Sequence, residues 1–278
     1  HYWIKCRPMQ LKSTIFLSVI FIFNSFVSKA QGDLMIMPKR VVFDGSQRSQ
    51  EVNLVNTGTD TASYAISFIQ YKMKEAGGFV EITEPEEGQF FADKNLRYYP
   101  RRVRLAPNEA QTVKLQITRS GELENREYRS HLYFRAIEKQ TALGSDEAQN
   151  DQNGISLNIK TVFGISIPVI IKVGTSTTKI ELTNITFDRD THRLSIDFDR
   201  SGNMSTYGNL RIMHHTKDAE PVLVGQVKGI AVYAPNPKRR FSFEIQDKEH
   251  FDQSKGSLHI IYETEDGDVM GKKVFDLE

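Results

Sequence analysis

The sequence predicts an all-β protein built from two β-sandwich domains. Short segments alternate between apolar and polar residues, and Gly, Asn and Pro recur between those segments. No stretch of about 12 or more residues has the periodicity of an amphipathic helix. The chain has 278 residues, of which 39% are hydrophobic and 26% charged, and this composition excludes a disordered or collagen-like chain.

The first 30 residues have the pattern of a secretory signal peptide. A short basic segment, 9–12, precedes an apolar run, 15–23, and Ser28 and Ala30 supply the small residues of a cleavage site. We expect cleavage after Ala30 and export of the rest of the chain, with residues 1–8 lying upstream of the true start. The alternative is an N-terminal membrane anchor, for which the apolar run is short.

The first domain is expected to span residues 31–173. Its short strands are predicted at residues 34–37, 41–43, 51–55, 64–71, 103–105, 111–117 and 131–137. Residues 138–154 contain too few apolar groups to offset their ordering entropy, so a flexible loop is expected there. A long strand at 155–173 follows this loop, and a hinge is predicted at 174–178.

The second domain is expected to span residues 179–278. Its segments alternate in the same way and are separated by glycines, namely Gly202, Gly208, Gly225, Gly256 and Gly267. Strands are predicted at residues 179–182, 194–198, 210–213, 222–224, 230–233, 240–245, 257–262 and 273–277.

Charge and motif content exclude several function classes. The formal net charge is +1, but the first 30 residues hold four basic residues and no acidic one, so the remaining chain carries −3, which argues against nucleic acid as a partner. The only cysteine, Cys6, lies in the leader, so the exported chain has no thiol nucleophile. The sequence has no phosphate loop, dinucleotide motif or catalytic motif, and we expect neither an enzyme nor a cofactor. His214 and His215 are neighbours on one strand, point to opposite faces and make a poor metal chelate.

Basic residues inside apolar strands are the most informative feature. Arg40 follows Lys39 at a break between two strands, and Lys160 lies within the long strand. A further cluster occurs at residues 101–104, Arg-Arg-Val-Arg. Each of these cations, taken alone, is most simply explained as a residue on the solvent-exposed face of a strand whose other face is buried.

Four segments, in the same order along the chain as the family's motifs, resemble the PapD-like chaperones of pilus assembly. Residues 40–45, Arg-Val-Val-Phe-Asp-Gly, are similar to the family's first-strand motif, Arg-x-Val-Phe-Asp-Gly. Residues 53–56 (Asn-Leu-Val-Asn), 105–113 (Leu-Ala-Pro-Asn-Glu-Ala-Gln-Thr-Val) and 125–134 (Asn-Arg-Glu-Tyr-Arg-Ser-His-Leu-Tyr-Phe) resemble later motifs. The resemblance covers residues 33–173, and beyond residue 179 it is architectural only.

This resemblance implies two immunoglobulin-like domains in a bent arrangement. It also implies a periplasmic protein that binds pilus or other surface-fibre subunits, stabilises them by donor-strand complementation and delivers them for assembly. The expected partners are those subunits and an outer-membrane usher, and the chain is expected to be a monomer. The alternative function is a secreted structural or adhesive β-sandwich module, because sandwich folds host many functions.

The resemblance also suggests how a subunit is held. In the family, basic residues in the cleft between the domains bind the C-terminal carboxylate of a subunit, and Arg40 matches the family's Arg. Lys160 has the strand parity of the second cation but lies several residues early, so Arg102, Arg104 and Lys172 are alternatives. Glu127 and Lys172 are expected to face each other between the domains.

The long strand carries the predicted donor residues. Ile155, Leu157 and Ile159 alternate with polar residues and therefore share one face. We expect this trio to enter a groove of the subunit as a donated strand. The alternative is that the three side chains fill the core of the first domain.

Overall fold

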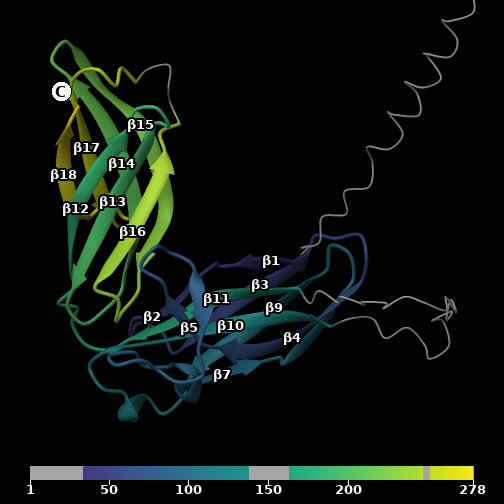
Figure 1. Ribbon diagram of the computed structural model, residues 1–278. Helices are drawn as coiled ribbons and strands as arrows, with labels where there is room; N and C mark the ends of the chain where they lie inside the picture. The colour runs from purple at the N-terminus through teal and green to yellow at the C-terminus, as the bar shows by residue number, and fades with distance from the viewer. Residues whose placement is uncertain (1–33, 138–162, 247–250, 278) are drawn as a thin grey trace, which may run out of the picture.

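The computed structural model describes residues 34–137, 163–246 and 251–277, and nearly every element in them is a β-strand (Figure 1). Within these ranges the only helices are two short 3-10 turns, η1 (Asp93–Asn95) and η2 (Ser120–Glu122). The all-β prediction is therefore confirmed. None of the described helices is long and apolar enough to cross a membrane.

Two sheets form the first sandwich. One has the strand order β1-β3-β9-β7 and the other β2-β11-β10-β4-β8. Their pairings are antiparallel except that of β2 with β11, which is parallel and runs from Val41 opposite Val169 to Phe43 opposite Ile171. The strands are β1 (Leu34–Met37), β2 (Val41–Phe43), β3 (Ser49–Asn56), β4 (Ala62–Ile69), β7 (Leu96–Tyr99), β8 (Arg102–Leu105), β9 (Ala110–Ile117), β10 (Glu127–Ile137) and β11 (Gly164–Lys172).

The second sandwich also has two sheets, with the orders β12-β13-β16 and β15-β14-β17-β18. All of its pairings are antiparallel. The strands are β12 (Lys179–Asp188), β13 (Arg193–Ser201), β14 (Thr206–Thr216), β15 (Ala219–Val232), β16 (Lys238–Glu244), β17 (Ser257–Glu263) and β18 (Val269–Asp276).

Each sandwich has its own apolar core, because the period-two alternation of its strands turns apolar side chains inward. In the first core, Leu54 of β3 belongs to the same buried cluster as Leu132 and Phe134 of β10. In the second, Leu194 of β13 belongs to the same cluster as Ile212 of β14. All five side chains are completely buried.

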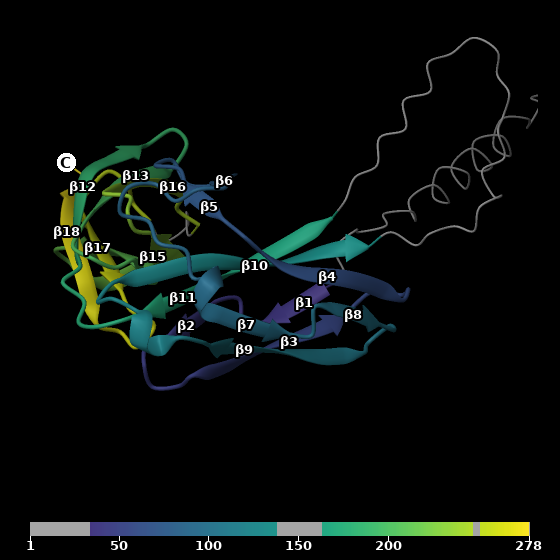
Figure 2. The ribbon, with the colours of Figure 1, turned by 90° about the horizontal axis from the view of Figure 1, so that it is seen from below.

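The two sandwiches lie at an angle, so the molecule is bent (Figure 1). A hairpin of β5 (Tyr71–Met73) and β6 (Phe79–Glu81) leaves the first sandwich and lies beside the second near β16 (Figure 2). The backbone amide of Arg240 in β16 donates a hydrogen bond of 2.7 Å to the carbonyl of Glu75 in the hairpin turn. The hairpin therefore bridges the two sandwiches.

Some predicted strand boundaries are wrong. The strand predicted at 64–71 ends at Ile69, and the β5–β6 hairpin was not predicted as a pair of strands, because β6 is exposed along its length and shows no alternation of burial. The strands predicted at 222–224 and 230–233 are one strand, β15. Gly225 lies inside it, and a Cβ atom there would come within 2.9 Å of the Phe243 ring. This glycine allows close packing between sheets and does not end a strand.

Several predictions lie outside the described residues. These are the signal peptide at 1–30, the loop at 138–154 and the first part of the strand predicted at 155–173. The end of that strand is described, and β11 accounts for residues 164–172. Residues 173–178 then connect β11 to β12 without a strand.

Candidate functional site

A cleft of about 860 Å³ lies between the two sandwiches. Lys39, Arg40 and Lys172 line it from the first sandwich, and Ser205 and Tyr207 line it from the second. Arg40 directly precedes β2 and Lys172 ends β11, and the parallel pairing of these strands places Arg40 at the start of the paired segment and Lys172 at its end. Both residues line the same cleft.

Arg40 lies against aromatic rings of the second sandwich. Its Nη1 donates a hydrogen bond of 3.1 Å to the hydroxyl of Tyr233. The guanidinium carbon lies 4.5 Å from the ring centroid of Tyr207 and 5.5 Å from that of Tyr233. Within the described residues Arg40 has no carboxylate within ion-pair distance. The two rings orient the guanidinium and leave its charge available for an anion.

Lys172 is the second cation of the cleft. Burial lowers the pKa of its ammonium group, the carboxylate of Glu127 opposes that effect, and the charge of Arg40 adds to it. Its Nζ likewise has no ion-pair partner in the part of the chain that the structure describes. Two cations that line one cleft and have no ion-paired carboxylate among the described residues favour the binding of an anion between them.

Glu127 links the two sandwiches. It is 6% exposed, and its carboxylate accepts hydrogen bonds from the backbone amide of Ser205 at 2.9 Å and from the Ser205 hydroxyl. Glu127 lies directly opposite Lys172 in the β10–β11 register. Close pairing of the two charged groups stays a prediction, whereas the contact of Glu127 with Ser205 was not foreseen from the sequence.

Tyr233 lies between two arginines. The guanidinium carbon of Arg129 is 4.3 Å from the Tyr233 ring centroid, on a residue that is only 4% exposed. Arg129 donates a long hydrogen bond of 3.5 Å to the carbonyl of Ala234. Met73 and Ile170 complete a small buried cluster with Tyr233 that spans both sandwiches. The packing of Arg129 on Tyr233 could not be predicted from the sequence, because the alternation along β10 predicts an exposed position for Arg129.

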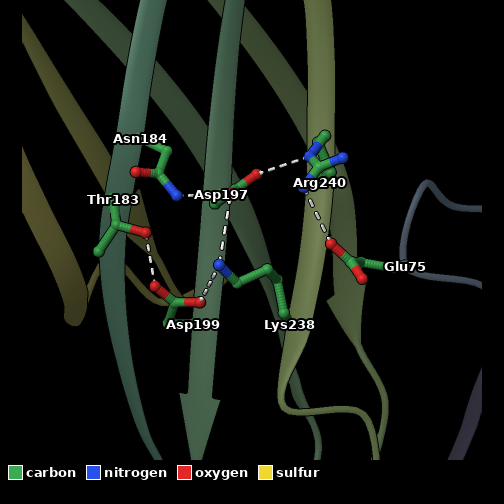
Figure 3. A network of polar contacts seen from close by, with 7 residues as sticks. All are labelled: Glu75, Thr183, Asn184, Asp197, Asp199, Lys238 and Arg240. Carbon is green, nitrogen blue, oxygen red and sulfur yellow. Dashed lines mark hydrogen bonds and ion pairs between the residues drawn. The ribbon is translucent and has the colours of Figure 1, made fainter.

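A polar network on β16 adds to the link between the sandwiches (Figure 3). The Arg240 Nε donates to Asp197 of β13 at 3.2 Å, and its Nη2 pairs with Glu75 of the hairpin at 3.1 Å. Burial raises the pKa of Asp197, but hydrogen bonds from Asn184, Arg240 and Lys238 outweigh burial, so the pKa lies below its usual value. Asp197 therefore stays ionised and holds Arg240 toward the hairpin.

The first domain carries the sequence signature that decides the family. The family model described as the pili and flagellar-assembly chaperone, PapD N-terminal domain, matches residues 33–172. The chain belongs to this family. The resemblance predicted from four motifs is confirmed, as are the two immunoglobulin-like sandwiches.

Solved structures of fimbrial and pilus chaperones are similar to the chain. One is a chaperone–tip adhesin complex of CFA/I fimbriae, with 12% identity, a TM-score of 0.44 and coverage of 88% of this chain and 98% of that one. Another is the CsuC–CsuE chaperone–subunit complex of Acinetobacter baumannii, with 10% identity, a TM-score of 0.43 and coverage of 88% and 98%. The CupB2 chaperone of Pseudomonas aeruginosa has 13% identity, a TM-score of 0.40 and coverage of 87% and 98%. No curated protein matches in the corresponding sequence search.

Two of the alternative cations of this PapD-like chain, Arg102 and Arg104, are not in the cleft. Arg102 and Arg104 are exposed on β8, at the opposite edge of the sheet from β2, so neither is the second cation of the cleft. Lys160 and the donor residues Ile155, Leu157 and Ile159 lie outside the described residues.

The neighbouring histidines of β14 point in different directions. His214 is buried and its Nε2 lies 2.9 Å from the carbonyl of Lys255, whereas His215 stacks on His259 at 3.7 Å between ring centroids. Among the described residues, no group of three or more His, Cys, Asp or Glu is placed to hold a metal ion.

Proposed function

We propose that this chain is a chaperone that binds and stabilises subunits of a pilus or related surface fibre and delivers them for assembly. The family match over residues 33–172 favours this function over a structural or adhesive module. The observation that carries the proposal is the placement of Arg40 in the cleft, held by two tyrosines and without a carboxylate partner among the described residues.

The proposed role of the cleft is to bind the C-terminal carboxylate of a subunit. The guanidinium of Arg40 offers two parallel N–H donors, which fix the direction of a carboxylate as well as attract it. We assign the second charge to Lys172 in place of Lys160, because Lys172 lines the cleft and is partly buried there. Burial lowers the pKa of Lys172, so a bound anion stabilises its charged form.

The proposed donated strand is the segment that continues into β11. Within the described residues, β2 covers only residues 169–171 of β11, which leaves 164–168 without a strand partner on that side. An open strand edge offers main-chain hydrogen bonds to an added strand, and alternate side chains enter pockets of the partner. We assign Ile155, Leu157 and Ile159 to those pockets.

The proposed chaperone acts without catalysis and outside the cytoplasm. Strand pairing and apolar burial supply the free energy for capture, so no chemical step or cofactor is required. The leader pattern at residues 9–30 supports export to the periplasm. We place the domains at residues 31–173 and 179–278 and the hinge at 174–178, with an outer-membrane usher as a further partner.

Capture of subunits by Arg40 variants tests the proposal. We expect Arg40→Ala to abolish co-purification of subunits from the periplasm. Arg40→Lys should retain part of it, because Lys keeps the positive charge but lacks the two parallel N–H donors of a guanidinium. Thermal unfolding of each variant checks the fold, since Arg40 also packs on Tyr207 and Tyr233. Arg102→Ala is the matched control, because it removes an exposed arginine outside the cleft. Normal capture by a folded Arg40→Ala variant would contradict the proposed role of Arg40.

A further inference from the structure

The cleft has two walls of opposite charge. The first sandwich contributes three cations, Lys39, Arg40 and Lys172, and one acid, Asp44, so this wall is positive in sum. The turn between β17 and β18 of the second sandwich contributes Glu265 and Asp266. Both sets of side chains line the same cavity of about 860 Å³. Binding of a subunit carboxylate gives the cations of the first wall a role, but it gives none to the acidic residues of the second wall.

The acidic turn is held in a fixed shape. The amide of Thr264 donates to the carbonyl of Asp268 at 2.9 Å, and the amide of Asp268 donates to the Thr264 hydroxyl at 3.0 Å. Gly267 has a φ of 93°, a conformation that side-chain-bearing residues rarely adopt. The backbone therefore presents Glu265 and Asp266 to the cleft from a defined position.

The opposite charges of the two walls do not neutralise each other. Among the described residues, neither Glu265 nor Asp266 has a hydrogen-bond or ion-pair partner for its carboxylate. Asp44, the third acid of the cleft, accepts hydrogen bonds from the amide and hydroxyl of Ser46, and these bonds lower its pKa. The two carboxylates of the turn are therefore free to bind a cation that enters the cleft.

An occupant that brings only a negative charge leaves this cavity unbalanced. Its carboxylate is attracted by Arg40 and Lys172 but repelled by Glu265 and Asp266 across the cavity. An occupant that also carries a cation on its other side satisfies both walls. Met37 and Met270, which line the cleft as well, offer apolar surface for the methylene stem of a Lys or Arg side chain.

We propose that the cleft selects subunits whose C-terminal segment carries a Lys or Arg side chain within its last three residues, next to the terminal carboxylate. This inference rests on the proposed function, because the carboxylate is taken to bind at Arg40. Glu265 and Asp266 are then specificity-determining residues, and the ligand is a dipolar chain end with a negative terminus and a positive side chain.

Synthetic peptides test this selection directly. Fluorescently labelled nine-residue peptides of alternating Val and Thr, with a free C-terminal carboxylate, carry Lys at the last, second-last or third-last position, and matched peptides carry Gln there. Fluorescence anisotropy then measures the Kd of each peptide. We expect the best Lys peptide to bind roughly two- to five-fold more tightly than its Gln match at about 50 mM salt, and the difference to shrink at about 500 mM.

Two charge-removing variants locate the effect. Glu265→Gln/Asp266→Asn removes the acidic turn and is expected to bind Lys and Gln peptides equally. The control variant, Asp218→Asn/Glu220→Gln, also removes two carboxylate charges, but at the turn that joins β14 to β15. This turn lies at the opposite end of β14 from Thr206, which lines the cleft, so the variant is expected to keep the preference for Lys peptides.

The outcomes separate this inference from the proposed function. Equal binding of Lys and Gln peptides, with binding lost when the C-terminus is amidated or Arg40 is replaced by Ala, overturns the selection but keeps the anchor. A preference for Lys that survives in Glu265→Gln/Asp266→Asn also overturns it. If amidation and Arg40→Ala leave binding unchanged, or if no free-acid peptide binds at millimolar concentration, the proposed anchor fails, and the inference that rests on it fails as well.

Discussion

At the scale of single residues, His131 shows how the second domain and the hairpin change the surroundings of β10. Alternation along β10 turns His131 away from the core of the first sandwich, yet it is 3% exposed. Its ring packs against Tyr71 at 4.9 Å and Phe79 at 5.5 Å between centroids, both from the β5–β6 hairpin. Burial lowers the pKa of His131 to about 3, and the nearby charges of Arg129 and Arg40 add to the shift.

We predict a loss of stability in mild acid that depends on His131. The unfolded chain protonates this ring near its usual pKa of 6.5, whereas the folded chain does so only near about 3. The unfolded state therefore binds more protons between these values, and the contribution present above pH 6.5 is lost as the pH falls toward 3. Between pH 7 and pH 5 the free energy of unfolding should fall by about 2 kcal/mol from this group.

Urea unfolding at the two pH values checks this prediction. His131→Phe keeps an aromatic ring against Tyr71 and Phe79. In this variant the decrease in the free energy of unfolding from pH 7 to pH 5 should be smaller than in the wild type by about 2 kcal/mol. His192→Asn, at a turn of the second sandwich with a positive φ that Asn tolerates, serves as the control and should keep the wild-type loss. An identical pH dependence in wild type and His131→Phe would count against the assignment.

Glu127 is the second residue with a prediction of its own. Glu127→Gln keeps the shape of the side chain but removes the charge that accepts two hydrogen bonds from Ser205. We expect the free energy of unfolding to fall by about 1–3 kcal/mol, the range for a buried hydrogen-bonded charge. Glu124→Gln removes an exposed carboxylate paired with Arg126 and should cost about 0–1 kcal/mol. Denaturant titration of both variants measures the difference, and equal small effects would contradict a linking role for Glu127.

At the scale of elements, the β5–β6 hairpin makes an ionic and an apolar contact with the second sandwich. Glu75 pairs with Arg240 on side chains that are 53% and 61% exposed. Met73, by contrast, is 3% exposed and packs in the cluster with Tyr233. Exposed ion pairs contribute little to stability and buried apolar groups contribute more, so the packing of Met73 stabilises the docked hairpin more than the ion pair does.

Two variants of the hairpin separate these contributions. We expect Glu75→Gln to change the free energy of unfolding by about 0–1 kcal/mol. Met73→Ala should lower it by about 2–3 kcal/mol, because a buried side chain is removed and leaves a cavity. Thermal and denaturant unfolding of the two variants measure the ranking. A larger loss in Glu75→Gln than in Met73→Ala would show that the ion pair docks the hairpin.

The sequence predicts local elements better than contacts between them. Strands such as β1, β2 and β9 follow from apolar alternation over a few residues, and Arg40 follows from a short motif. The hydrogen bond between Arg40 and Tyr233 joins residues 193 positions apart, and that between Glu127 and Ser205 spans 78 positions. No local pattern encodes such a separation, so the second wall of the cleft was not predictable.

At the scale of the whole molecule, two separate cores are joined by a small shared cluster. The core of the first sandwich and that of the second have no member in common, whereas Met73, Ile170, Ala231 and Tyr233 form a cluster drawn from both. The position of Arg40 relative to the acidic turn at Glu265 therefore depends on this cluster. A cleft built in this way is sensitive to residues that lie in neither core.

Tyr233→Ala tests whether the shared cluster sets the cleft. Tyr233 is 5% exposed and lies between Arg40 and Arg129, so truncation removes packing for both arginines at once. We expect a loss of about 3–5 kcal/mol in the coupling between the sandwiches, seen as separation of one calorimetric transition into two and as a larger radius of gyration in small-angle scattering. Tyr99→Ala, which truncates a side chain that is 78% exposed, should change neither measurement. Because neither core contains Tyr233, both domains of Tyr233→Ala should stay folded while capture of subunits falls, whereas normal capture would mean that the cleft keeps its shape without this cluster.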